Sequence, residues 1–448
     1  MGVVGTGYVG TVVAACLAHV GHQVVGLEVD ERKLGLLREG RTPFYEPGLA
    51  TLLTGGLDSE RLRFTGDVAE AVASSDVLFL CVGTPSGQDG HADVGALADA
   101  VRVIAETVDG PKVLVTKSTV PIGSGRWVEG IVDDAQPADL RRRAPVTVVS
   151  NPEFLRQGSA VDDYLHPDRV VLGSDDPDAL ERVARIYEPI LQQRLNGDAA
   201  SRRPVLVRTT LASAETVKYA SNAFLALKIS FANEIANICE LVGADVTDVV
   251  HAMGLDERIG ARFLDAGAGW GGSCFGKDLS ELIAAASDHG YDARLLRAAK
   301  SVNGWQRELV VKKVRRHLHG LRGRRVGLLG LAFKPGTDDL RDAPSLDIAR
   351  ALLAGGATVL AHDPVVRSVP GFPELRIAGD PYEAGERADA VVLVTEWSDY
   401  LELELGVLRD RMRGRLLLDS RNLFDPAKVR TAGLHYEGIG RANGVGPA

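Results

Sequence analysis

A cysteine in a glycine-rich turn is the residue whose surroundings most favour chemistry. Residues 269–278 read GWGGSCFGKD and place Cys274 shortly after three glycines. Glycine accepts positive φ and lets a ligand approach the backbone closely. If a helix begins near Ser273, its N–H groups and positive dipole end favour the thiolate of Cys274. Asp278 then lies one turn later on the same face, which pairs a nucleophile with a group that moves protons.

The alternative for this turn is a buried, unreactive cysteine, which is the usual state of an unpaired cysteine. The other three cysteines, Cys16, Cys81 and Cys239, lie in apolar helix or strand patterns, and we expect them in the core. The four show no disulfide or metal-ligand spacing, so we predict no metal site and a reducing, cytoplasmic location.

A long helical pattern over residues 211–242 carries a second set of polar groups. Lys218 and Asn222 are four residues apart and share a helical face. An amine and an amide directed into a cleft would stabilise an oxyanion. For Lys228 and Glu234, an exposed face with salt bridges is the simpler expectation. The helix is longer than most in globular proteins, which suits a spine between two domains.

The N-terminal residues fit a dinucleotide fingerprint. The sequence GTGYVG at 5–10 follows a short strand, opens a helix that extends to about Val20, and precedes a strand at 22–27 that ends at Glu28. Gly5 gives the tight turn, Gly7 lets a pyrophosphate approach, and Gly10 allows close packing of helix and strand. A carboxylate at Glu28 accepts hydrogen bonds from ribose hydroxyls and repels a 2′-phosphate, which favours NAD over NADP.

Three polar residues follow two or three positions after the ends of predicted strands at 76–82, 112–117 and 146–150. Further β-branched runs occupy 169–173 and 205–208. Ligands of open parallel sheets bind beyond the carboxyl ends of the strands. Thr84, Thr119 and Glu153 fall there, although turn capping is an alternative for the two threonines.

After Gly320 the pattern of strands resumes at 325–329, 358–361, 390–394 and 416–418, with a helix from about Pro344 and no G-x-G-x-x-G. We therefore predict an α/β fold of two doubly wound Rossmann-like domains joined by a central helical domain with one long spine helix. The expected domains are an NAD-binding Rossmann domain at 1–208, a central helical domain that contains the cysteine at 209–310, and a second Rossmann-like domain at 311–448.

Composition narrows the classes of partner. The 448 residues carry a net charge of −9, which argues against nucleic acid or an anionic membrane as partner. No apolar run is long enough to span a membrane, and the first residues lack the basic region of a signal peptide. The strand before Gly5 is short, so we expect the natural start to lie upstream of Met1.

Ten motifs together give the chain a resemblance to the UDP-glucose/GDP-mannose dehydrogenase family, in its branch that acts on UDP-glucose. The resemblance extends from Gly5 to about Asn422. The motifs are GTGYVG (5–10), CVGTP (81–85), KSTVP (117–121), NPEFL (151–155), VKYASNAFLALKISFANE (217–234), RIG (258–260), GWGGSCFGKD (269–278), SVN with Gln306 after it (301–303), GLAFKPGTDDLRDAP (330–344) and TEW (395–397).

The resemblance implies an NAD-dependent four-electron oxidation of the sugar's primary alcohol to an acid. By this resemblance Cys274 forms a thiohemiacetal and then a thioester, and Lys218 and Asn222 steady the oxyanion. Asp278 works with Lys218 in proton transfer, while Glu153 and Thr119 help water to hydrolyse the thioester.

The resemblance also implies binding residues, a sugar-nucleotide-binding role for the domain at 311–448, and a homodimer through the central helices of the domain at 209–310. Cofactor contacts are expected from Gly5, Gly7, Tyr8, Val9, Gly10, Glu28, Lys33, Thr84, Thr119, Lys277 and Arg341. Nucleotide-sugar contacts are expected from Glu153, Phe154, Leu155, Arg156, Gln157, Lys218, Asn222, Phe263, Leu264, Asp265, Ala266, Gly267, Gly271, Phe333 and Lys334, and from Arg258 of the partner subunit.

Four positions depart from the family pattern. Gln157 stands where many relatives have Glu, Gly276 where proline is common, Trp270 where a smaller aromatic is usual, and Ser420 where glycine occurs. Ser420 leaves Arg421 only a weak candidate for the substrate site.

Three alternatives stay open. The same chemistry on another sugar nucleotide is one: GDP-mannose, a UDP-N-acetylhexosamine or TDP-glucose. The others are a one-step 3-hydroxyacid dehydrogenase and a sugar-nucleotide sensor without activity. Phe275 and the position of Gln306 favour UDP-glucose.

Overall fold

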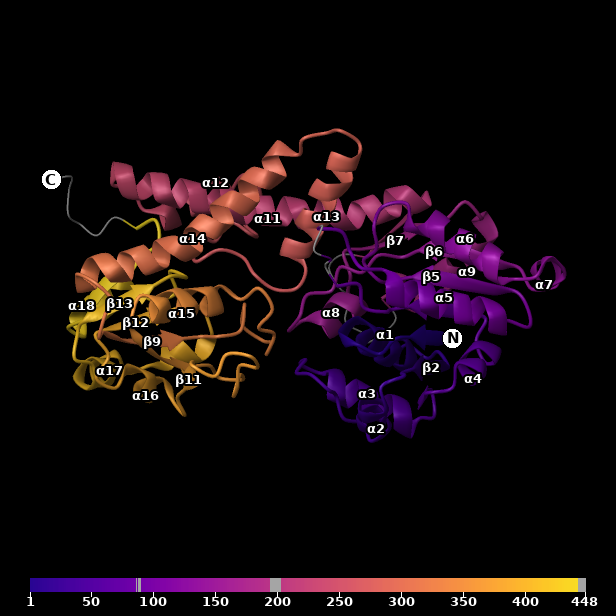
Figure 1. Cartoon of the computed structure of the whole chain (residues 1–448), viewed down its shortest axis with the longest axis horizontal. Coiled ribbons are helices and arrows are strands. Elements are labelled where there is room, and N and C mark those ends of the chain that lie inside the picture. The colour runs from indigo at the N-terminus through magenta and orange to yellow at the C-terminus, as the bar shows by residue number, and fades with distance from the viewer. Residues whose placement is uncertain (86, 88–89, 194–202, 442–448) are drawn as a thin grey trace. The chain divides into compact units, whose positions relative to one another are not determined.

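The computed structural model describes residues 1–85, 87, 90–193 and 203–441. The chain divides into two compact units (Figure 1). The N-terminal unit comprises Met1–Ser221 and Ser280–His289, and the C-terminal unit comprises Asn222–Leu279 and Gly290–Ala448. Two helices, α11 (Leu211–Val242) and α13 (Phe275–Asp288), contribute residues to both.

The N-terminal unit is built on an eight-stranded sheet in the order β3-β2-β1-β4-β5-β6-β7-β8. The first six positions repeat the 3-2-1-4-5-6 order of dinucleotide-binding folds, and their strands run parallel. The last pair is reversed, because β7 meets β6 antiparallel through Ser150 and Gly173. The strands are β1 (Gly2–Val4), β2 (Val24–Leu27), β3 (Leu62–Thr65), β4 (Val77–Leu80), β5 (Lys112–Thr116), β6 (Val146–Ser150), β7 (Arg169–Gly173) and β8 (Val205–Thr209).

Helices cover both faces of this sheet and give it two apolar cores (Figure 1). Buried strands such as β4, with the sequence VLFL, are apolar throughout because both faces are covered. Aspartates accept backbone amides and fix where helices begin, as Asp30 does for α2 and Asp67 for α4. The helices are α1 (Tyr8–His19), α2 (Glu31–Arg38), α3 (Leu49–Asp58), α4 (Val68–Ala73), α5 (Gly95–Thr107), α6 (Ser124–Ala135), α7 (Ala138–Arg143), α8 (Ala160–Leu165), α9 (Pro177–Ile186) and α10 (Glu188–Leu191).

The C-terminal unit contains a six-stranded parallel sheet in the order β11-β10-β9-β12-β13-β14. Numbered from its own first strand, this is again 3-2-1-4-5-6, which confirms the second doubly wound fold. Sequence patterns did not predict β3, β11 or β14, which are short or lie at sheet edges. The strands are β9 (Arg325–Leu329), β10 (Thr358–His362), β11 (Arg376–Ile377), β12 (Ala390–Leu393), β13 (Leu416–Asp419) and β14 (His435–Gly438).

The helices of this unit include the rest of the central region. The predicted spine is confirmed as α11, and α13 begins at Phe275, close to the helix start considered near Ser273. The others are α12 (Val246–Gly254), α14 (Arg294–Leu318), α15 (Pro344–Ala354), α16 (Pro381–Gly385), the 3-10 helix η1 (Ser398–Glu402), α17 (Leu405–Arg411) and α18 (Pro426–Thr431).

Across the described ranges, no helix has both the length and the apolar character that a membrane crossing requires.

Candidate active site

Cys274 stands at the N-terminal end of α13. Its carbonyl accepts the amide of Asp278 at 2.8 Å, which makes Cys274 the N-cap residue of the helix. The side chain is exposed, and its sulfur lies 3.6 Å from the hydroxyl oxygen of Ser273. Cys274 therefore stands at the positive end of the helix dipole, a position that in general favours the thiolate form of a cysteine. The other three cysteines are buried, as predicted.

Asp278 lies one turn further into the helix and is buried. Its Oδ2 accepts a hydrogen bond from Asn222 Nδ2 at 2.6 Å, and its Oδ1 lies 3.4 Å from Lys277 Nζ. The structure thus brings Asn222, on the spine, to the helix that carries Cys274 at its start. An amide that donates to one carboxylate oxygen fixes the orientation of both groups.

Glycines let the turn before Cys274 pack against the loop after β9. A Cβ at Gly271 would lie 2.3 Å from the carbonyl oxygen of Asp342, and one at Gly272 would lie 2.7 Å from the ring of Phe333. Gly272 also has φ +87° and donates its amide to the Arg341 carbonyl at 3.0 Å. No larger residue could occupy these positions without moving that loop.

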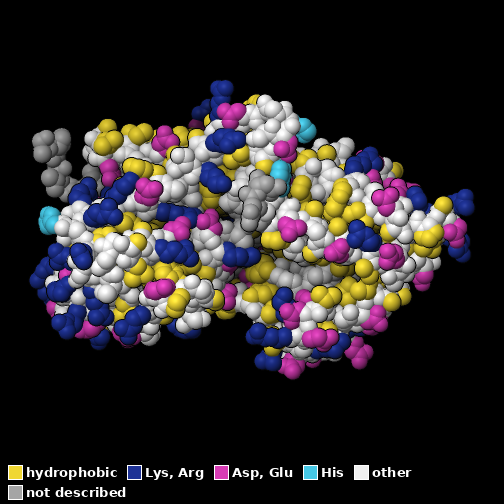
Figure 2. All heavy atoms as spheres, viewed as in Figure 1, with side chains coloured by type: hydrophobic (Ala, Val, Ile, Leu, Met, Phe, Trp, Pro, Cys, Tyr) yellow, Lys and Arg dark blue, Asp and Glu magenta, His cyan; other side chains and the backbone are white. Residues whose placement is uncertain are grey.

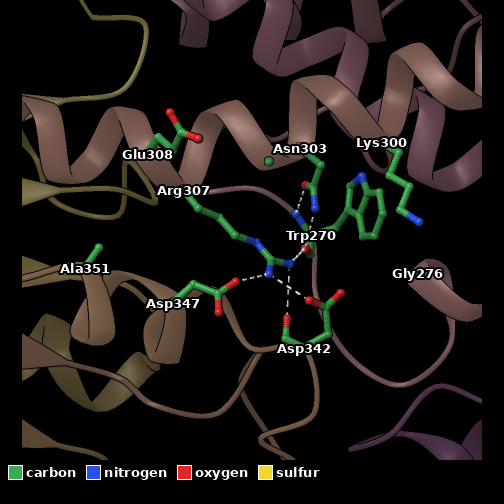
Figure 3. A pocket seen from close by; sticks show the side chains of 10 residues that line it. Trp270, Gly276, Lys300, Asn303, Arg307, Glu308, Asp342, Asp347 and Ala351 are labelled. Carbon is green, nitrogen blue, oxygen red and sulfur yellow. Dashed lines mark hydrogen bonds and ion pairs between the residues drawn. The ribbon is translucent and has the colours of Figure 1, made fainter. Parts of the chain in front are cut away.

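Arg307 of α14 ties the same turn in place, although no sequence pattern singles it out. Its guanidinium lies 2.7 Å from Asp342 and 2.5 Å from Asp347, and it donates to the Trp270 carbonyl at 2.8 Å (Figure 3). Asn303 makes two hydrogen bonds to the backbone of Trp270: its Oδ1 accepts the Trp270 amide at 2.7 Å, and its Nδ2 donates to the Trp270 carbonyl at 3.0 Å. A pocket of about 370 Å³ opens beside these residues and is lined by charges of both signs.

The Trp270 indole is buried and donates to the Ser230 hydroxyl at 3.0 Å. Its bulk therefore fills the core beside the turn. Gly276, the second departure in this motif, lies in the first turn of α13, where an added Cβ would meet a carboxylate oxygen of Asp342 at 3.1 Å.

The segment 263–267 is held by amides of the central helices. Gly267 donates its N–H to Asn233 at 2.7 Å, and its carbonyl accepts from Gln306 Nε2 at 3.1 Å. Phe263 adopts a left-handed φ of +64° and faces Phe275 with ring centroids 6.4 Å apart. Leu264 and Ala266 are buried and Asp265 is exposed. Gln306 is therefore a scaffold for this segment.

Several predicted basic residues of the C-terminal unit have partners within it. Arg341 donates two hydrogen bonds to the carboxylate of Asp339, at 2.9 and 2.6 Å. It is also close enough to Cys274 for their charges to interact. Lys334 Nζ lies 5.9 Å from the centroid of the Phe333 ring. Arg258 is highly exposed and pairs with Asp256 at 2.6 Å.

The expectation of an exposed salt-bridging face needs correction for Lys228. Its Nζ donates to the carbonyls of Ile259, Gly260 and Arg262 at 2.7–3.1 Å, because among the described residues no backbone amide pairs with these oxygens of the loop after α12. Arg421 donates to the carbonyls of Val394 and Gly269, and its weak candidacy for the substrate site stays a prediction.

The dinucleotide loop has the geometry that its glycines predict. Gly5 has φ +84°, a Cβ at Gly10 would lie 1.9 Å from the Gly5 carbonyl oxygen, and Gly7 has open space where its Cβ would be. Glu28 is buried at the end of β2, where it accepts from the Thr6 hydroxyl at 2.8 Å and the Asp30 amide at 2.9 Å. The loop fits a dinucleotide, because the missing side chain at Gly7 leaves room for a pyrophosphate directly before the N-terminus of α1, and helix N-termini bind anions. Val9 is in the first turn of α1, and Lys33 is exposed on α2.

Tyr8 contacts a residue that no sequence motif had marked. Its hydroxyl donates to Glu46, which also accepts the amides of Gly158 and Ala160 at 2.7 Å each. Burial, with the hydrogen bond to Glu46, raises the pKa of Tyr8 well above its usual value. Glu46 therefore connects the dinucleotide loop to the segment after Glu153. The only sequence feature that could have marked Glu46 is its position in YEPGL (45–49), between a turn and a helix.

The strand ends bring the other predicted residues of this unit into two pairs. The Thr84 hydroxyl donates to the Thr119 carbonyl at 2.7 Å. Lys218 Nζ lies 2.6 Å from Glu153 Oε1, and both side chains are buried. Burial acts to raise the pKa of Glu153, but the ion pair with Lys218 and the Leu155 amide outweigh it and hold that pKa below its usual value.

The residues after Glu153 form a braced loop. Phe154 stacks under the Arg169 guanidinium at 3.9 Å, and the Leu155 amide donates to Glu153 at 2.7 Å. Arg156 forks onto Asp163, and Gln157 is partly buried beyond it. The predicted proton path from Lys218 to Asp278 joins residues of different units and stays a prediction.

One cluster elsewhere has the composition of a metal site. Ligand atoms of His317, His435 and Glu437 lie within 4.8 Å of one another. The two imidazoles stack, however, and Glu437 is already paired with Lys313 at 3.2 Å and Arg316 at 2.6 Å. These cations oppose the binding of another.

Three domain models of one family match successive parts of the chain. Residues 1–191 match the NAD binding domain of the UDP-glucose/GDP-mannose dehydrogenase family, residues 212–305 its central domain and residues 327–426 its UDP binding domain.

Individual relatives agree. The chain is 45% identical to the UDP-glucose 6-dehydrogenase of Pseudomonas aeruginosa, over 98% of this chain and 97% of that one, and 42% identical to UDP-glucose 6-dehydrogenase TuaD of Bacillus subtilis, over 98% and 92%. Its fold is similar to a solved UDP-glucose dehydrogenase from Pyrobaculum islandicum, with a TM-score of 0.89 and 38% identity over 98% of this chain and 97% of that one. The chain therefore belongs to the UDP-glucose/GDP-mannose dehydrogenase family.

Proposed function

We propose that this protein oxidises UDP-glucose to UDP-glucuronate with NAD, through a thiohemiacetal and a thioester on Cys274. The observation that carries the proposal is the exposed sulfur at the N-terminus of α13, with the buried Asp278 one turn away. Relatives at 45% and 42% identity that are UDP-glucose 6-dehydrogenases support the choice of substrate.

The covalent step explains why a thiol is needed. The first oxidation removes a hydride and a proton from the C6 alcohol and leaves an aldehyde. The Cys274 sulfur adds to that aldehyde, and the resulting thiohemiacetal loses a second hydride to become a thioester. Water then cleaves the thioester to the acid and restores the thiol. The chemistry that NAD supplies is acceptance of a hydride, twice for each acid formed.

The side chains around these steps have complementary roles. Lys218 and Asn222, one turn apart on α11, donate to the oxygen on which negative charge builds. Asp278 takes up and returns protons. Glu153 and Thr119 orient the water that attacks the thioester, and an ionised Glu153 is the form that can accept the proton of that water.

We assign the nucleotide sugar to the loop 153–157, the segment 263–267 and the residues Gly271, Phe333 and Lys334. A diphosphate calls for cations and backbone amides, and Lys334 is a cation beside an apolar ring. Lys277 and Arg341 supply further positive charge toward the cofactor. We propose the division 1–208, 209–310 and 311–448 for the corresponding domains, and a cytoplasmic location.

We further propose a homodimer through the central helices. Phe224, Phe231 and Ile238 occur at seven-residue intervals on α11, and Leu241 and Val242 continue the strip. These five side chains are 47–85% exposed. Hydrophobic side chains are visible at the upper left edge of the molecule in Figure 2, with charged side chains beside them. A seven-residue apolar repeat is typical of a helix that packs on another helix, and a second copy supplies one. Arg258 of the partner subunit would then reach the nucleotide sugar.

Two experiments test these proposals. With UDP-glucose, the ratio of NADH to acid should be two, whereas a ratio of one with free aldehyde contradicts the double oxidation. Parallel assays with GDP-mannose, UDP-N-acetylhexosamines and TDP-glucose test the choice of substrate.

The second experiment tests the dimer. Arg258→Ala and Cys274→Ser proteins, each expected to be inactive, are mixed and allowed to exchange subunits. Random exchange should restore about a quarter of wild-type activity if the site is shared between subunits, and no recovery contradicts the shared site.

A further inference from the structure

Lys117 is a buried lysine whose charge has no direct counterion. It lies immediately after β5, and its side chain is 5% exposed. Its Nζ donates to Asn151 Oδ1 at 3.2 Å and to the Tyr187 hydroxyl at 3.5 Å. The rings of Tyr164 and Tyr187 lie 5.6 and 5.8 Å from it. In the part of the chain that the structure describes, no carboxylate lies within 4.0 Å of this ammonium.

Such a group is costly for the fold. A buried ammonium loses its hydration, and neutral hydrogen bonds and aromatic faces restore only part of that free energy. Replacement of buried charges by apolar residues of similar volume is often neutral or stabilising. Stability alone therefore does not account for a lysine at this position.

The groups that Lys117 contacts lead directly to Glu153. Asn151 is the first residue after β6, and its carbonyl oxygen Oδ1 accepts from both Lys117 and the Tyr187 hydroxyl, the latter at 2.5 Å. Its Nδ2 donates to the Val171 carbonyl at 2.9 Å, and its amide donates to Thr116 at 2.9 Å. The oxygen and the nitrogen of this side chain are thus both engaged, two residues before Glu153.

Electrostatics points the same way. Among the described residues, the charged and titratable groups that interact electrostatically with Glu153 are Lys218 on α11, Lys117 after β5, Tyr8 in the dinucleotide loop, and Cys81 directly after β4. Burial works against the ionised form, and Lys218, the Leu155 amide and Lys117 together lower the pKa of Glu153. Lys117 is the contributor that does not touch the carboxylate.

We propose that Lys117 is a positioning residue for Glu153: through Asn151 it fixes the loop that carries the carboxylate, and its positive charge favours the ionised form. The inference rests on the proposed role of Glu153 in hydrolysis of the thioester. On this account the buried ammonium of Lys117, which has no directly paired carboxylate among the described residues, is retained because it supports that hydrolysis.

The test compares Lys117→Met with Lys112→Met. Lys112 begins the same strand, is equally buried, and lies at the opposite end of β5 from the candidate site. Single-turnover acid formation is measured with enzyme in excess over UDP-glucose from about pH 5 to pH 9, since the acid limb reports the protonation of the base. Lys117→Met should move that limb upward by about one pH unit, because loss of a nearby cation raises the pKa of a carboxylate.

The controls separate positioning from a general structural role. Lys112→Met should leave the limb where the wild type has it, and Lys117→Arg, which keeps the charge, should do so too. The thermal midpoint of Lys117→Met should equal or exceed that of the wild type. A Lys117→Met protein whose acid limb does not move, whether or not its rate falls, overturns the proposal. The NADH-to-acid ratio, measured on the same wild-type preparation, reports separately on the proposed function.

Discussion

The two sheets of this protein share a strand order and differ in the loop after their first strand. In the N-terminal unit β1 ends at Val4 and α1 begins at Tyr8, so only residues 5–7 separate them. In the C-terminal unit β9 ends at Leu329 and α15 begins at Pro344, with residues 330–343 between. Both loops start with a glycine at positive φ that packs against the end of the fourth strand, Gly5 on Cys81 and Gly330 on Thr395.

The acidic residue after the second strand shows the consequence. Glu28 ends β2 beside an open dinucleotide loop, whereas its counterpart Asp363, after β10, accepts the amides of Leu331 and Ala332 at 2.7 and 3.0 Å. In the first sheet the carboxylate accepts from the Thr6 hydroxyl and the Asp30 amide. In the second sheet the carboxylate accepts two backbone amides of the loop itself, and this long loop packs against the turn before Cys274. The same strand order thus carries the dinucleotide loop in one unit and a loop that packs against the turn before Cys274 in the other.

The largest effect is expected from the thiol itself. Cys274→Ser keeps the size of the side chain but replaces the sulfur by a poorer nucleophile. Acid formation from UDP-glucose should fall by about 1,000-fold or more, because loss of a covalent nucleophile has effects of this order. Binding of NAD, measured by fluorescence quenching, should be unchanged. Acid formation by this variant at the wild-type rate would contradict the role of the Cys274 sulfur as the nucleophile.

Glycine substitutions test the cofactor side. Gly10→Ala places a methyl group 1.9 Å from the Gly5 carbonyl oxygen, so α1 must shift. We expect the KM for NAD to rise about 100-fold and the thermal midpoint to fall, as overpacking costs about 1–3 kcal/mol. Gly7→Ala has open space in the protein and is the matched variant: its thermal midpoint should stay, while its KM for NAD rises because the methyl group occupies the path of the pyrophosphate. Equal thermal midpoints for the two variants would contradict the role assigned to each glycine.

Asp363→Asn tests the second sheet. When the NH2 group of the new side chain takes the place of Oδ2, the backbone amides of Leu331 and Ala332 lose their acceptor. A buried donor without a partner costs about 1–3 kcal/mol. The KM for UDP-glucose should rise several-fold, and the KM for NAD should stay constant. Asp425→Asn, at the exposed start of α18, is the control and should change neither constant. A rise in the KM for NAD alone would reverse the assignment of the two sheets.

The smallest effect concerns the choice of cofactor. Glu28→Gln keeps a hydrogen-bond acceptor and removes the charge that repels a 2′-phosphate. The preference for NAD over NADP, as a ratio of kcat/KM values, should shrink by about tenfold, equivalent to about 1.4 kcal/mol. An unchanged preference would mean that another residue excludes the phosphate.

Local patterns predicted the sheets and the spine well, because a dinucleotide fingerprint and a long apolar helix are written in consecutive residues. They could not predict Arg307, whose partners Asp342 and Asp347 lie 35 and 40 residues away. The same holds for Glu46, which joins Tyr8 to Gly158 over more than 100 residues. Long-range contacts of this kind depend on the folded sheet order. The antiparallel pairing of β7 with β6 could not be predicted either, because β-branched runs carry no direction.

The covalent intermediate on Cys274 can be sought directly. A Glu153→Gln protein, which should hydrolyse the thioester slowly, is mixed with UDP-glucose and NAD, quenched in acid and analysed by intact-mass and peptide mass spectrometry. An added UDP-glucuronyl group is expected on the peptide that contains Cys274. An adduct on Cys16, Cys81 or Cys239, or NADH formation without any adduct in the quenched protein, would contradict catalysis through this sulfur.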